Sequence, residues 1–79
     1  MKVTIIAHVL FYDDTYKAHV LQFSIFFRGT IKHEVVSSSG ERMSQIKRAA
    51  GVHVRAEPGV VYKFVCACAR NGARRLFVS

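Results

Sequence analysis

Carboxylates, cysteines and proline are scarce in this chain, which has 79 residues but only five Asp and Glu, two Cys, one Pro and no Trp. Two cysteines cannot form the framework of several disulfides that stabilises many small secreted domains. Paired carboxylates at a spacing useful for acid–base catalysis are also missing, since Asp13 and Asp14 adjoin at an expected turn. The sequence also lacks a plausible activated serine. We therefore predict that the chain is not an enzyme.

Metal and cofactor motifs are missing as well. Cys66 and Cys68 form a C-x-C pair, whereas zinc sites usually combine a C-x₂₋₄-C pair with a second pair of ligands. The four histidines are dispersed, although strand alternation places His8 and His33 on one sheet face near Ser24. No glycine pattern matches a phosphate-binding or dinucleotide-binding loop. We predict reduced cysteines, no metal and no cofactor.

A single domain over residues 1–79 is expected from the length. The apolar start of the chain is interrupted by His8, is followed by Asp13 and Asp14, and lacks a small-residue cleavage site. This run is also about half the length needed to span a bilayer. We expect a cytoplasmic protein that does not enter a membrane.

Residue patterns divide the chain into short strands and one helix. Stretches rich in β-branched and aromatic residues predict strands, bounded by turn residues such as Arg28-Gly29, Pro58-Gly59 and Asn71-Gly72. The predicted strands are Val3–Tyr12, Tyr16–Phe27, Thr30–Val36, Val52–Ala56, Val60–Ala69 and Ala73–Val78. A three-residue turn between the first two strands would place Ile5 opposite Phe23 and Ala7 opposite Leu21.

The predicted helix spans Ser39–Ala50. Ser38 and Glu41 have the S-x-x-E spacing of a capping box, and Met43, Ile46 and Ala50 recur at helical spacing. Gly51 is suited to the left-handed conformation that ends many helices.

This order, β-β-β-α-β-β-β, predicts an α+β fold with an antiparallel sheet and one helix. If Val52–Ala56 is a loop, the order matches that of a small OB-like barrel. The strand Tyr16–Phe27 is apolar on both faces, and a single helix cannot cover two faces. Either barrel closure or a homodimer would bury the second face.

Basic residues are concentrated in the second half of the chain. The net charge is +7, and residues 41–79 hold eight basic and two acidic residues, a balance of +6. Such asymmetry indicates a basic surface for a polyanion or an acidic protein. Arg70, Arg74 and Arg75 surround the Asn71-Gly72 turn and are expected to cluster. The complete candidate nucleic-acid-binding set is Arg42, Lys47, Arg48, Arg55, Lys63, Arg70, Arg74 and Arg75.

Two functions are consistent with these features. The first is a small non-enzymatic protein that binds DNA or RNA mainly through phosphate contacts, with Tyr12, Tyr16 and Tyr62 as candidate stacking surfaces. The second is a protein-binding inhibitor or adaptor, of the kind found in phages and mobile elements, that uses an exposed sheet edge or apolar face.

Overall fold

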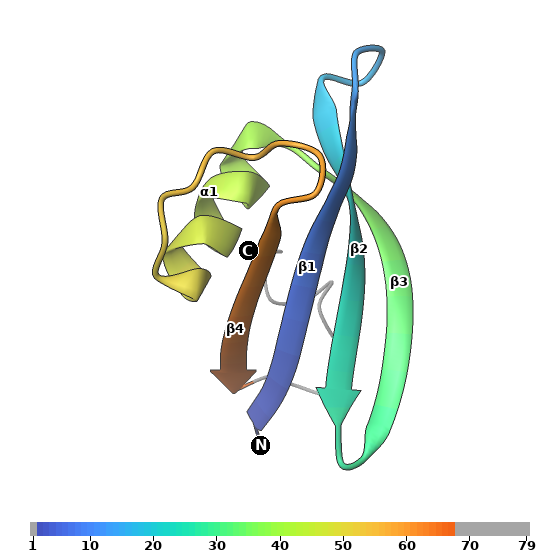
Figure 1. Cartoon of the computed structure of the whole chain (residues 1–79), viewed down its shortest axis with the longest axis vertical. Coiled ribbons are helices and arrows are strands. Elements are labelled where there is room, and N and C mark those ends of the chain that lie inside the picture. The colour runs from blue at the N-terminus through green and yellow to red at the C-terminus, as the bar shows by residue number, and fades with distance from the viewer. Residues whose placement is uncertain (1, 68–79) are drawn as a thin grey trace.

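The computed structural model describes residues 2–67, which form one sheet and one helix. The elements are β1 (Lys2–Asp13), β2 (Ala18–Phe27), β3 (Thr30–Ser38), α1 (Gly40–Ala50) and β4 (Val61–Ala67). Figure 1 shows α1 beside β4, with the β1–β2 turn at one end of the sheet and the β2–β3 turn at the other. The predicted α+β class is confirmed, and the predicted strand Ala73–Val78 lies outside the described residues.

The strand order is β3-β2-β1-β4, and each neighbouring pair is antiparallel. Among the described strands, β3 and β4 are therefore the outer ones. Within residues 2–67 the sheet is open, so the predicted OB-like barrel is not observed in this part of the chain.

The strand predicted over Val52–Ala56 is wrong, because this segment is not a strand and pairs with none of the strands within residues 2–67. Two of its backbone groups form hydrogen bonds outside the sheet. The Val52 N–H donates to the carbonyl of Lys47 at 3.2 Å, and the carbonyl of Val54 accepts from the Tyr62 hydroxyl at 2.8 Å. Residues of high β propensity form a strand only where a partner strand is available to them.

The β1–β2 turn is longer than predicted. Asp13 Oδ1 accepts from the backbone N–H groups of Thr15 at 2.9 Å and Tyr16 at 3.3 Å, and Lys17 has a positive φ of 51°. An aspartate that bonds to the backbone two or three residues ahead stabilises such a turn. As a result β2 begins at Ala18 rather than at Tyr16.

The predicted β1–β2 register is also wrong, by two residues. Ile5 lies opposite Ile25 and Ala7 opposite Phe23. Because side chains alternate with a period of two, this shift leaves the residues of β1 up to Val9 on the faces that were predicted. The shift results from the longer turn, which pairs Asp13 with Ala18, and from an irregularity between Val9 and Phe11 that changes the register by one residue.

The helix begins one residue later than predicted, because Ser39 is the N-cap and its Oγ accepts from the Arg42 N–H at 3.3 Å. The predicted capping box of Ser38 and Glu41 is therefore wrong, and Ser38 is a buried residue at the end of β3. The predicted end is confirmed: Gly51 has a left-handed φ of 71°, and its N–H donates to the Arg48 carbonyl at 3.2 Å.

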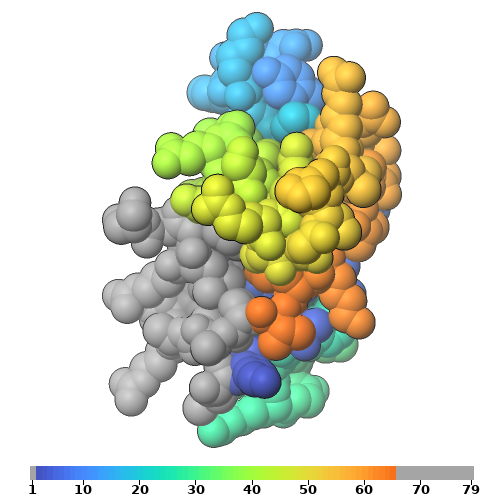
Figure 2. Space-filling model, turned by 90° about the vertical axis from the view of Figure 1, so that its left-hand side faces the viewer, coloured from blue at the N-terminus to red at the C-terminus, as the bar shows by residue number. Residues whose placement is uncertain are grey.

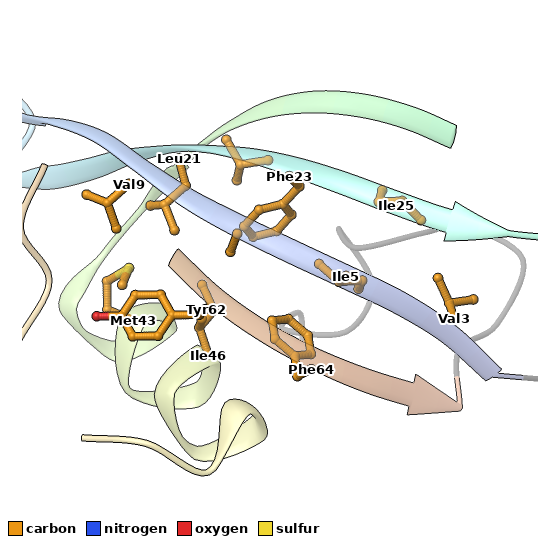
Figure 3. Packing of buried hydrophobic residues seen from close by; sticks show 12 residues of the cluster. Val3, Ile5, Val9, Leu21, Phe23, Ile25, Met43, Ile46, Tyr62 and Phe64 are labelled. Carbon is orange, nitrogen blue, oxygen red and sulfur yellow. The ribbon is translucent and has the colours of Figure 1, made fainter. Parts of the chain in front are cut away.

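The core lies between α1 and one face of the sheet. Figure 3 shows Val9, Leu21 and Phe23 on the sheet, with Met43 and Ile46 on the helix. Burial of each such side chain contributes about 1.5–3 kcal/mol. The buried cluster contains Val3, Ile5, Ala7, Val9, Leu21, Phe23, Ile25, Val36, Met43, Ile46, Tyr62 and Phe64.

The opposite side of the sheet, called here the open face, has no helix over it within residues 2–67. Directly paired residues of antiparallel strands lie on the same face, so the register defines its rows. They are Ile31–Phe26–Thr4–Val65, His33–Ser24–Ile6–Lys63 and Val35–Gln22–His8–Val61. No helix in the described part of the chain is long and apolar enough to cross a membrane.

Candidate nucleic-acid interface

A bulge in β1 determines which aromatic ring lies near the helix. The register shifts between Val9 and Phe11, so that Phe11 pairs with Val20 and Tyr12 pairs with His19. The extra residue moves Tyr12, rather than Phe11, onto the same side of the sheet as Val9. The rings of Tyr12 and His19 meet edge to face, with centroids 4.8 Å apart.

One side of α1 lies next to this aromatic pair. Met43 and Lys47 are four residues apart, so they lie on one side of the helix. Gly40, Met43 and Lys47 all line a pocket that also includes Tyr12 and His19. The Lys47 side chain is half-buried there.

The segment after the helix forms the remaining wall. The bond from Tyr62 to Val54 fixes the residue that precedes Arg55. The Pro58-Gly59 turn is attached to β1 by two bonds, from the Gly59 N–H to the Val9 carbonyl at 2.9 Å and from the Val9 N–H to the Val60 carbonyl at 2.8 Å. Arg55 and Ala56 consequently line the same pocket. Figure 2 shows the tip of the β1–β2 hairpin, the helix and this segment meeting at one end of the molecule.

The pocket has a volume of about 400 Å³ and is lined by Tyr12, His19, Gly40, Met43, Lys47, Arg55 and Ala56. Its lining contains two cationic side chains and no carboxylate. Neither Lys47 nor Arg55 has a side-chain hydrogen bond or ion pair within residues 2–67. Uncompensated cations in a concave site attract anions, and the guanidinium group suits phosphate particularly well.

The structure separates the basic residues that the sequence grouped together. Lys47 and Arg55 converge on the pocket, whereas Lys63 lies on the open face. Arg42 donates from its guanidinium to the Ser37 carbonyl at 3.2 Å, which gives this side chain a structural role at the start of α1. Arg48 is exposed in the last turn of the helix. Arg70, Arg74 and Arg75 lie outside the described residues.

The three tyrosines have different environments. Tyr62 is 1% exposed in the core, so it is not a stacking surface, and burial raises the pKa of its phenol above the ordinary value of 10.0. Tyr16 is 77% exposed in the β1–β2 turn, and Tyr12 is 43% exposed at the pocket. Tyr12 is a stacking surface predicted from the sequence, whereas no sequence pattern predicts His19 beside it. Regular strand alternation carries no signal of the bulge that brings Tyr12 and His19 to the pocket.

The open face contains the histidines predicted to share a side. His8 and His33 do lie on this face, and the Ser24 Oγ is 3.1 Å from Nδ1 of His33. Within residues 2–67, no group of three or more His, Cys, Asp or Glu side chains is arranged to hold a metal ion. Cys66 lies in β4 opposite Val3, and Cys68 lies outside the described residues. That the chain is not an enzyme stays a prediction.

Comparison with protein-family models, with curated proteins and with solved structures finds no match to this chain. The function of the protein is therefore inferred from its own residues and their geometry.

Proposed function

We propose that this protein binds nucleic acid, and that the pocket between the β1–β2 hairpin, α1 and the segment containing Arg55 holds backbone phosphate. The observation that carries the proposal is the convergence of Lys47 and Arg55 on a pocket without a carboxylate. Both side chains lack partners within residues 2–67, so a phosphate would not have to displace an existing ion pair there.

The aromatic residues at the same end support a role for unpaired bases. Tyr12 is partly exposed beside the two cations, and Tyr16 projects from the adjacent turn. Stacking of a base on an aromatic side chain contributes about 1–3 kcal/mol and requires no particular base identity. We expect single strands to bind with little sequence preference.

The experiment is a salt titration of binding, followed by the fluorescence anisotropy of labelled single-stranded and duplex oligonucleotides. The variant Lys47→Gln/Arg55→Gln should weaken binding to all sequences. It should also lower the salt slope by roughly one to two units, since each phosphate contact contributes about 0.7 for single strands and about 0.9 for duplex DNA.

Two further double variants are compared with it, and each also removes two positive charges. The first is a matched control, and the second tests a rival site. Lys2 and Lys32 are exposed and lie away from the β1–β2 turn, so Lys2→Gln/Lys32→Gln should change the slope little. Arg74→Gln/Arg75→Gln tests the hairpin favoured by the sequence. If that variant lowers the slope and the pocket variant does not, the pocket is not the site. Absence of wild-type binding at low salt would refute nucleic-acid binding altogether.

The alternative predicted from the sequence, a protein-binding inhibitor or adaptor, would use the open face and not the pocket. The two surfaces lie on opposite sides of the sheet, so one activity does not exclude the other.

A further inference from the structure

Half of the twelve residues in the three rows of the open face are apolar, and four of these apolar side chains are well exposed on the outer strands. Antiparallel sheets with one solvated face commonly carry polar residues there. Here both outer strands place aliphatic side chains in solvent: Ile31 and Val35 in β3 are 55% and 62% exposed, and Val61 and Val65 in β4 are 53% and 55% exposed. Exposed aliphatic side chains that share one face of a sheet are a feature of many contact surfaces.

These residues form two strips along the outer strands, one of Ile31, His33 and Val35 in β3 and one of Val61, Lys63 and Val65 in β4, so that each strip has one polar residue between two aliphatic ones. Ile31 and Val65 end one row across the sheet, and Val35 and Val61 end another row. The strips are three strand spacings apart, or about 14 Å. An α-helix with its side chains has a diameter of about 10–12 Å, so a helix lying along the strands covers the central strands and reaches each strip with the side chains at its margins.

The charge of the open face limits the choice of partner. Lys63 in β4 is the one formal charge in the three rows, Lys2 lies on the same face at the start of β1, and none of these residues is a carboxylate. The described carboxylates lie elsewhere: Asp13 and Asp14 at the β1–β2 turn, Glu41 in α1, Glu57 after the helix, and Glu34 opposite the buried Phe23.

A second copy docked through the same face would therefore offer Lys63 no opposite charge. Nucleic acid is also a poor fit, because phosphates would lie against the exposed aliphatic strips. A partner with apolar residues on one side and carboxylates at its margin would complement both features of the surface.

We propose that the open face docks an acidic amphipathic helix of another protein, with the aliphatic side of that helix over the two strips and a carboxylate at Lys63. In such an interaction, apolar residues at positions i, i+3, i+4 and i+7 of the ligand helix make the contacts. It is independent of the phosphate pocket, which lies on the other side of the sheet.

The test uses two synthetic helical peptides that share a leucine face and differ only at its margins, one carrying Glu and the other Lys. The wild-type protein should bind the Glu peptide at least tenfold more tightly, with amide shift changes in NMR spectra confined to open-face residues. Lys63→Glu should reverse this preference. Arg48→Glu makes the same charge change at an exposed position on α1 and should leave it unaltered.

A second variant, Val35→Ser/Val61→Ser, removes one exposed aliphatic side chain from each strip. It should bind the Glu peptide at least tenfold more weakly than the wild type does. Oligonucleotide binding of this variant should be unchanged, which separates failure of this proposal from failure of the phosphate pocket. Equal binding of both peptides, or shift changes on the helix side, would overturn the proposal. It would also be overturned by sedimentation equilibrium showing a wild-type dimer that becomes monomeric in Val35→Ser/Val61→Ser, because a second copy would then be the occupant.

Discussion

Ile5 and Ile6 are neighbours in β1, yet they belong to two different surfaces. Ile5 is fully buried in the cluster beneath α1, whereas Ile6 lies in the central row of the open face between Ser24 and Lys63. Both faces of the sheet are rich in β-branched residues, and within residues 2–67 only one face has a helix over it. Residue type therefore does not distinguish the core of this protein from its exposed open face. The position of α1 makes that distinction.

The largest effect is expected from truncating matched isoleucines on the two faces. Ile5→Ala should lower the free energy of unfolding by about 2–5 kcal/mol, because it leaves a cavity among well-packed neighbours. Ile31→Ala, at a side chain that is 55% exposed, should change it by about 0.5 kcal/mol or less. Equilibrium unfolding in urea measures both values. A similar loss for both variants would mean that the open face is covered in solution.

Two adjacent serines sharpen the comparison at the junction of β3 and α1. Ser39→Ala should lower the free energy of unfolding by about 1 kcal/mol, because the Arg42 N–H loses the Ser39 Oγ that caps the helix. Ser38→Ala should cost less or even stabilise the fold, since the buried Ser38 Oγ has no hydrogen-bond partner in the described part of the chain. Urea unfolding followed by circular dichroism tests the pair. A larger loss for Ser38→Ala would show that its hydroxyl has a partner after all.

The smallest effect concerns the buried phenol of Tyr62. Burial raises its pKa in the folded state, so the folded protein retains this proton at a pH where the unfolded chain has released it. The resulting contribution to stability is fully present below pH 10 and is lost as the pH rises through the folded-state pKa. The free energy of unfolding of the wild type should thus fall more steeply above pH 10 than that of Tyr62→Phe. Parallel urea titrations of both proteins between about pH 9 and 11.5 measure this difference, and parallel pH profiles would contradict it.

Local sequence determined most of the elements. The runs of β-branched and aromatic residues fixed β1, β2 and β3, and the predicted turn at Arg28-Gly29 is present with positive φ values at both residues. Gly51 ended the helix where its conformational freedom predicted. These features depend on a few neighbouring residues, which is why they can be read along the chain.

Tertiary structure decided the arrangement that carries the candidate sites. The bulge that moves Tyr12 to the helix side, the absence of a strand at Val52–Ala56, and the separation of Lys63 from Lys47 all depend on contacts between segments distant in sequence. A β-branched segment becomes a strand only beside a partner strand. A lysine lines a pocket only if the fold places its helix or strand next to that pocket. The sequence by itself determined the positions of the basic residues, the apolar residues and the glycine that ends the helix. Which of these residues come into contact was decided by the packing of α1 on one face of the sheet.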